Sequence, residues 1–208
     1  MTPLAPRRPR LAIAGGVLTA LMATLTATGV LRSLDQYTVD HLMPWLEIHH
    51  HSLVSFGALT VPSLEPPFAN TALELWTYPA AVLPSLLIVL VAARQLARPD
   101  AIVWLLLWCA GNAIELAGKL TLRKPDLYHD TVHVPAFDTS LPSGHTIRAL
   151  VLAGAVAAAW RSGRFAVLWA ATVPLALVAS GAHTPSDVAT GVLVAMMLAA
   201  WAPNVSAA

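Results

Sequence analysis

The chain has 208 residues, of which 57% are hydrophobic and only 11% are charged, and its mean hydropathy is +0.66. This composition is too apolar for a water-soluble domain of that length, so the bilayer is the expected solvent. A net charge of +1 gives no indication of nucleic-acid binding, and the single cysteine, Cys109, excludes an intrachain disulfide framework.

Six apolar stretches approach the roughly 20 residues that a membrane-spanning helix needs. In chain order they cover residues 11–31, 72–93, 101–118, 146–160, 165–182 and 188–201. The fourth and the sixth are short, so each should borrow residues from its flanks. The first is longer than the apolar core of a signal peptide, about 7–15 residues, and we interpret it as a span. We therefore expect an all-α integral membrane protein, a six-helix bundle formed by one domain over residues 1–208.

Arginines predict the orientation of this bundle. They occur before the first span, between the second and third, and between the fourth and fifth, and six spans place these three segments on one side. The arginines are Arg7, Arg8, Arg10, Arg94, Arg98, Arg161 and Arg164. Because basic loops stay on the cytoplasmic side, residues 32–71, 119–145 and 183–187 should face the extracytoplasmic side of a cytoplasmic membrane.

The segment between the first two spans is too polar to cross the bilayer, but it is amphipathic. Its apolar residues are Leu42, Trp45, Leu46, Ile48, Leu53, Val54 and Phe56, and they predict an interfacial helix that ends before the proline-rich "VPSLEPP". The same segment contains His49, His50 and His51. Consecutive residues on a helix point in different directions, so we predict no metal site there.

The linker "RSGR" is so short that the fourth and fifth spans must form an antiparallel hairpin. The outer start of the fourth span then lies beside the outer end of the fifth, which brings His145 close to His183. Lys119 ends the third span and Asp187 begins the sixth, on the same side. Four helix ends should therefore converge on two histidines, a carboxylate and several cations.

This set of residues suits phosphate chemistry. A helix start offers free N–H groups and the positive end of the helix dipole, Ser143 can cap the helix or donate to a phosphate oxygen, and Gly144 leaves the backbone accessible. Two histidines can divide the work, because one can attack phosphorus while the other protonates the leaving oxygen. Asp187, four residues after His183, can fix the tautomer of that imidazole. The cations that can neutralise a phosphoryl group are Lys119, Arg123, Lys124 and Arg148.

At these residues the chain resembles the type 2 phosphatidic acid phosphatase family, the membrane branch of a superfamily that includes vanadium haloperoxidases. "LPSGHT" matches the family's second motif in full, and "GAHTPSD" matches the His and Asp half of its third, within a motif region over residues 115–187. The resemblance implies that His183 is the nucleophile of a phosphohistidine intermediate, Asp187 its orienting partner and His145 the general acid. It implies phosphate contacts from Ser143 and Gly144, and a reaction without a metal or another cofactor.

The chain departs from the family pattern at two places. The Arg that lies six residues before the third-motif His is replaced by Leu177, so one phosphate clamp is missing. In "KLTLRKPD", Pro125 comes two residues sooner after Lys119 than in the family, and Lys124 stands where Arg precedes Pro. Arg123 can supply the missing guanidinium of this motif.

Two of the cations have a structural alternative to phosphate binding. Arg148, one turn after His145, is a candidate replacement for the clamp lost at position 177, whereas the alternative is that it snorkels to the headgroups. Lys119 can bind phosphate or pair with Glu115, four residues earlier.

The sequence therefore predicts an integral membrane lipid phosphatase, independent of metal, that acts at the extracytoplasmic face. Its substrate would be a phosphomonoester or diphosphate on a lipid: undecaprenyl diphosphate, phosphatidic acid, phosphatidylglycerol phosphate or a prenyl-phosphate sugar. Two alternatives stay open. One is a lipid phosphotransferase, and the other is a catalytically silent lipid-phosphate binder or transporter with the same fold.

Overall fold

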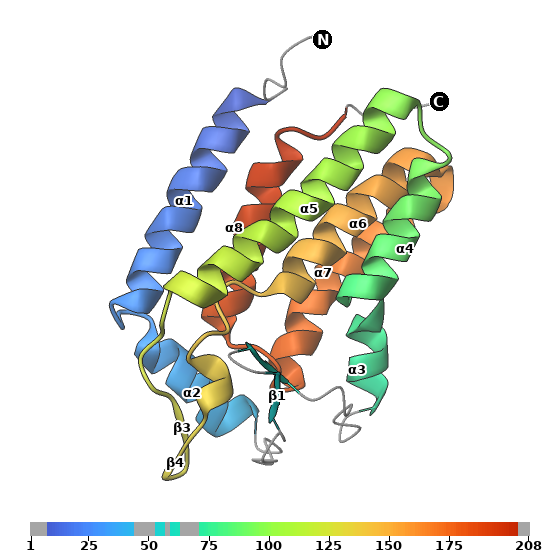
Figure 1. Cartoon of the computed structure of the whole chain (residues 1–208). Helices are drawn as coiled ribbons and strands as arrows, with labels where there is room; N and C mark the ends of the chain where they lie inside the picture. The colour runs from blue at the N-terminus through green and yellow to red at the C-terminus, as the bar shows by residue number, and fades with distance from the viewer. Residues whose placement is uncertain (1–7, 44–52, 57–58, 63–70, 204–208) are drawn as a thin grey trace.

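A computed structural model describes residues 8–43, 53–56, 59–62 and 71–203, and it is mainly helical (Figure 1). Its α-helices are α1 (Pro9–Ala27), α2 (Arg32–Leu42), α3 (Thr71–Thr77), α4 (Val82–Ala93), α5 (Arg98–Thr121), α6 (Gly144–Ala159), α7 (Arg164–Ala179) and α8 (Pro185–Ala199). Three short 3-10 helices are η2 (Tyr78–Ala80), η3 (Pro135–Phe137) and η4 (Arg161–Gly163). Two antiparallel pairs join β1 (Leu53–Phe56) to β2 (Leu59–Pro62) and β3 (Tyr128–His129) to β4 (Val132–His133).

All six predicted spans contain helix. Among the described residues, α1, α5 and the continuous segment Arg161–Ala179 are long and apolar enough to cross a membrane, whereas α4, α6 and α8 are apolar but shorter. As expected, the fourth and sixth runs borrow from their flanks, since α6 begins at Gly144 and α8 at Pro185. The second run is divided into α3, η2 and α4, because the chain is extended at Ala81 before α4 begins. Six membrane crossings stay a prediction.

Helix α6 is the centre of the bundle and packs against α4, α5, α7 and α8. Glycines allow two of these close approaches. A Cβ on Gly154 would lie 2.5 Å from the Trp104 ring of α5, and a Cβ on Gly191 of α8 would lie 2.8 Å from the carbonyl oxygen of Ser143. Since such distances are too short for real Cβ atoms, these helices need glycine to pack at this separation.

The prediction of an interfacial helix between the first two spans is wrong for residues 53–56, which form a strand. Helix α2 occupies the first part of that segment, but Leu53–Phe56 form strand β1, which pairs with β2 in the register Val54↔Val61. The runs "LVSF" and "LTVP" are rich in apolar and β-branched residues and flank Gly57, a pattern that favours a hairpin over a helix. His49, His50 and His51 lie outside the described residues.

The loop between α5 and α6 is fastened to α2. The side-chain amide of Gln36 donates to the Tyr128 carbonyl at 2.5 Å, the Tyr128 N–H donates back to Gln36 Oε1 at 3.0 Å, and Arg32 Nε donates to the Asp126 carbonyl at 3.1 Å. These contacts hold α2 and the β3–β4 hairpin together at the end of the bundle where α6 and α8 begin (Figure 1).

Candidate active site

Four helix ends meet at one end of the bundle: α5 and α7 finish there, and α6 and α8 begin there (Figure 1). His145, in the first turn of α6, and His183, just before α8, lie beside each other with ring centroids 6.4 Å apart and ring planes inclined by 58°. The proximity expected from the short "RSGR" linker is therefore present in the structure. One imidazole comes from the start of α6 and the other from the loop before α8, and the two can contact one small group between them.

The backbone between α7 and α8 positions His183. Gly181 adopts φ = +74°, a left-handed conformation that favours glycine, so the chain can turn sharply after α7. The N–H of His183 then donates to the Leu177 carbonyl at 3.2 Å. Its Nδ1 lies 3.6 Å from Oδ2 of Asp187, and the residue is 8% exposed. Nδ1 therefore faces the carboxylate, which leaves Nε2 for chemistry.

Asp187 is completely buried and saturated with hydrogen bonds. Its Oδ2 caps the start of α8 by accepting from the Thr184 N–H at 3.0 Å, and it also accepts from Ser140 Oγ at 2.7 Å. Its Oδ1 accepts from Lys124 Nζ at 2.9 Å. These partners come from three parts of the chain, and together they fix the carboxylate beside His183.

Lys124 and Asp35 form the buried end of this network. The Lys124 ammonium lies 3.2 Å from Asp35 Oδ2, and Asp35 in turn accepts from the N–H and Oγ of Ser186 at 3.1 and 2.5 Å. Two carboxylates, Asp35 and Asp187, thus share one lysine, so this cluster carries one net negative charge. The role of Asp35 could not be predicted from the sequence, because nothing in the local pattern around it indicates a contact with Ser186, about 150 positions away.

Arg148 is buried in a second cluster. Its Nε donates to the Ala80 carbonyl at 2.7 Å, and its Nη1 donates to Asn112 Oδ1 at 3.0 Å and pairs with the Glu115 carboxylate. Lys119 Nζ also binds Glu115, at 2.7 Å. One carboxylate therefore serves two cations, and the cluster keeps one net positive charge. The contact of Asn112 with Arg148 was also not predicted from the sequence.

Ser143 and Gly144 begin α6. Ser143 is the N-cap, and its Oγ accepts from the N–H and Oγ1 of Thr146 at 3.4 and 3.1 Å. Its own N–H donates to the Asp187 carbonyl at 3.0 Å, which ties the start of α6 to the start of α8. The Glu115 carboxylate packs directly against Gly144, where any Cβ would collide with it. A carboxylate, that of Glu115, thus lies directly against this helix start.

Arg123 and Leu177 complete the predicted set. Arg123 is exposed and makes no hydrogen bond or ion pair within the described part of the chain. The side chain of Leu177 is buried in an apolar cluster with Ala149, Val173 and Val188, so only its backbone touches the site. Position 177 therefore provides no cation to clamp a phosphate, and the guanidinium that α6 provides is that of Arg148, which is buried.

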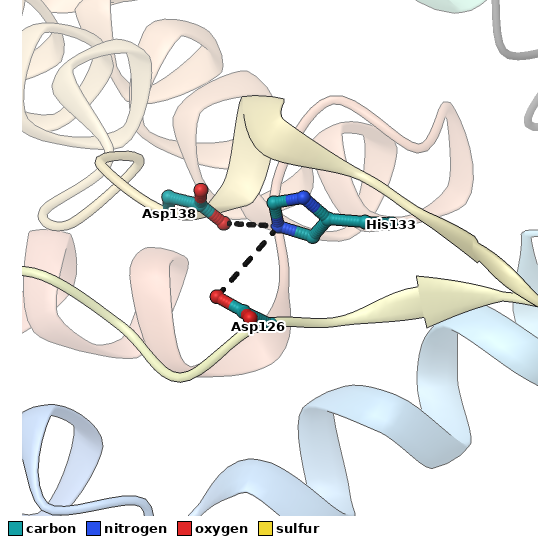
Figure 2. Close-up of side chains that lie close together, drawn as sticks. All are labelled: Asp126, His133 and Asp138. Atoms are coloured by element: carbon teal, nitrogen blue, oxygen red, sulfur yellow. Dashed lines mark hydrogen bonds and ion pairs between the residues drawn. The ribbon is translucent and has the colours of Figure 1, made fainter.

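One group of metal-ligating side chains lies in the α5–α6 loop. Asp126, His133 and Asp138 bring one ligand atom each to within 4.8 Å of one another (Figure 2). This group is separate from the two histidines of the candidate active site.

The family model described as the PAP2 superfamily matches residues 16–208, nearly the whole chain. The chain belongs to the PAP2 superfamily. Members of this superfamily are generally phosphatase-type hydrolases, and the apolar helices of this chain agree with a membrane protein. Comparisons with curated proteins and with solved structures gave no match.

Proposed function

We propose that this PAP2 chain is an integral membrane phosphatase that removes phosphate from a lipid phosphomonoester or diphosphate without a metal ion in the chemical step. The observation that carries the proposal is the pairing of His145 with His183 across converging helix ends, with Asp187 behind His183. Two imidazoles so placed can act on opposite sides of one phosphorus atom.

In the proposed reaction, Nε2 of His183 attacks phosphorus and the bond to the leaving oxygen breaks, while His145 gives that oxygen a proton. Water then attacks the phosphohistidine, His145 takes a proton from the water, and free phosphate leaves. His183 Nδ1 faces Asp187 Oδ2 at 3.6 Å without a hydrogen bond, and closing this gap during the reaction would favour the tautomer that has its lone pair on Nε2. Asp35 and Lys124 are positioning residues, because they act on His183 only through Asp187.

The two charge clusters support this division of roles. The cluster of Arg148, Lys119 and Glu115 keeps one positive charge beside the start of α6, where the free N–H groups also favour an anion. The cluster of Lys124, Asp35 and Asp187 keeps one negative charge behind His183, which favours the imidazole as it gains positive character during attack.

Helix length supports a lipid substrate. Helices α6 and α8 have 16 and 15 residues. At 1.5 Å per residue they are about 23 Å long, less than the roughly 30 Å of the hydrocarbon layer. If their C-terminal ends lie at the cytoplasmic interface, their first residues lie about 7 Å inside the hydrocarbon boundary on the other side, a depth that an embedded lipid can reach. An embedded lipid could then present its phosphate to His145 and His183 at the extracytoplasmic face.

A catalytically silent lipid-phosphate binder is the second candidate, and Leu177 favours it. With Leu177 in the apolar core and Arg148 already paired with Glu115, the described part of the site has no buried cation that lacks a partner. A phosphotransferase would use the same two histidines and differ only in the acceptor that takes the phosphoryl group.

An assay of phosphate release and transfer distinguishes the phosphatase from the silent binder and the phosphotransferase. Purified protein in liposomes that contain chelator is offered lipid monophosphates and diphosphates, with His183→Ala as the control. The proposal predicts release that survives chelation and disappears in the variant. Binding of the lipid without release would favour the silent binder, whereas formation of a phosphorylated lipid alcohol or sugar without free phosphate, once that acceptor is added, would favour the transferase.

A further inference from the structure

We propose that Asp126, His133 and Asp138 form a binding site for a divalent transition-metal cation, with Zn²⁺ as the first candidate. The three side chains come from different parts of the α5–α6 loop: Asp126 precedes β3, His133 ends β4 and Asp138 follows η3. Figure 2 shows both carboxylates pointing toward the same imidazole nitrogen. The inference goes beyond the proposed phosphatase, because these residues play no part in that reaction.

The distances suit a small cation. Nε2 of His133 lies 3.0 Å from Asp138 Oδ1 and 3.8 Å from Asp126 Oδ1. With Zn–N and Zn–O distances of about 2.0–2.1 Å, a tetrahedral site places neighbouring ligand atoms about 3.3 Å apart. The two observed separations bracket that value and the carboxylate oxygens lie within 4.8 Å of each other, so side-chain rotations can bring all three ligands around one ion.

The charges also favour a cation. Asp126 and Asp138 form no ion pair with any lysine or arginine among the described residues, and His133 is the one basic group that both contact. A neutral imidazole leaves two negative charges side by side, which a divalent ion would balance. One imidazole and two carboxylates suit Zn²⁺ or Mn²⁺ better than Mg²⁺, which prefers oxygen ligands alone. The partly exposed carboxylates leave room for water as a further ligand.

The backbone around the three residues is already ordered by other contacts. His133 is paired with Tyr128 across the hairpin, and the two rings lie 5.7 Å apart. The Lys124 N–H donates to the Asp138 carbonyl at 2.9 Å, which brings the two ends of the loop together. The ligands therefore need little reorganisation to bind an ion, which lowers the entropic cost of binding.

An ion here would stabilise the loop that supports Asp187. Lys124 and Ser140 both bind Asp187, and each lies two residues from a proposed ligand. Zn²⁺ at Asp126 and Asp138 would therefore hold together the two loop segments that carry these contacts. Its expected role is structural.

The test is a calorimetric Zn²⁺ titration of chelator-treated full-length protein in detergent, purified without a histidine tag. To exclude adventitious Zn²⁺ binding by consecutive histidines, every protein compared, the parent included, carries glutamine in place of His49, His50 and His51. We expect one equivalent of Zn²⁺ to bind, to raise the melting temperature, and to bind roughly tenfold or more weakly in His133→Gln and in Asp126→Asn. Mg²⁺ should not compete.

Asp130→Asn is the matched control, because Asp130 lies in the same hairpin but its carboxylate contacts His129 instead. Its Zn²⁺ affinity should stay unchanged. Asp126→Asn should fold normally, because the Asp126 side chain is 61% exposed, so weaker Zn²⁺ binding by this variant would reflect the lost ligand. No binding of Zn²⁺ would overturn the proposal, and so would equal affinity in the parent protein and both ligand variants. Phosphatase activity is not the readout, so failure here would leave the proposed function untouched.

Discussion

Asp187 is the residue on which the polar contacts of the site converge. It faces His183, caps α8, and accepts hydrogen bonds from Lys124 and Ser140. A buried carboxylate needs such partners, because an unpaired charge in a low-dielectric interior costs several kcal/mol. The contacts that keep Asp187 charged therefore also hold it at the distance from His183 that the proposed mechanism requires.

Asp35→Asn tests the outer part of this network. The change leaves Lys124 with one carboxylate partner and weakens the contacts with Ser186. We expect a loss of roughly 3–5 kcal/mol in the free energy of unfolding, because one partner is removed from a buried ion pair. Displacement of Asp187 should lower kcat by roughly tenfold to a hundredfold, with KM little changed.

Asp40→Asn is the control, since Asp40 is an exposed carboxylate on the same helix, bonded to Gln36. Equal kcat in the parent protein and Asp35→Asn, measured on folded protein, would contradict a positioning role for Asp35.

At the scale of elements, the site depends on how closely α8 approaches the start of α6. The Ser143 N–H binds the Asp187 carbonyl, and Gly191 lies against Ser143 and Thr146 one turn further along α8. His145 in the first turn of α6 and His183 in the loop that leads into α8 keep their relative position only if these two helices cannot slide or separate. A glycine contact of this kind is therefore part of what sets the distance between the two imidazoles.

Gly191→Ala tests this contact. The new Cβ would lie 2.8 Å from the Ser143 carbonyl oxygen and 2.9 Å from Thr146 Cβ, so α8 must move away from α6. We expect a destabilisation of about 1–3 kcal/mol, the usual cost of overpacking, and a fall in activity larger than the fall in stability alone would cause. In Gly16→Ala the new Cβ meets only the Met197 sulfur, at 3.7 Å, so this control should behave like the parent protein. Unchanged melting temperature and activity in Gly191→Ala would contradict the account.

At the scale of the whole molecule, the arrangement separates charge between the two ends of the bundle. The arginines of the α4–α5 and α6–α7 turns and of the start of α1 lie at one end, and the candidate active site lies at the other (Figure 1). The positive-inside rule then predicts that the site faces away from the cytoplasm.

Cysteine labelling tests this orientation. In a Cys109→Ser background, one cysteine is introduced at Asp130, whose side chain is 89% exposed, or at Arg164 in the opposite turn. A membrane-impermeant maleimide should label Asp130→Cys in intact cells and Arg164→Cys only after permeabilisation. The reverse pattern would contradict the predicted orientation, and labelling of both from outside would contradict six crossings.

Much of the helical framework could be predicted from hydropathy, and the proximity of His145 to His183 followed from the length of the "RSGR" linker alone. What could not be predicted are contacts between distant segments: Asp35 with Lys124, and Asn112 with Arg148. Nor did the sequence predict that both buried cations would already be paired with carboxylates. The β1–β2 pair was missed for another reason, since short apolar runs fit a helix and a strand equally well.

The most direct test of the central claim is to trap the phosphorylated enzyme. Protein in liposomes is mixed with a lipid carrying ³²P in its phosphate, quenched in alkali within milliseconds to seconds, and digested so that the labelled peptide can be sequenced. We predict that the label lies on His183, that it appears before phosphate is released, and that His183→Ala carries none. Turnover without label at position 183, or undiminished turnover by His183→Ala, would contradict the account.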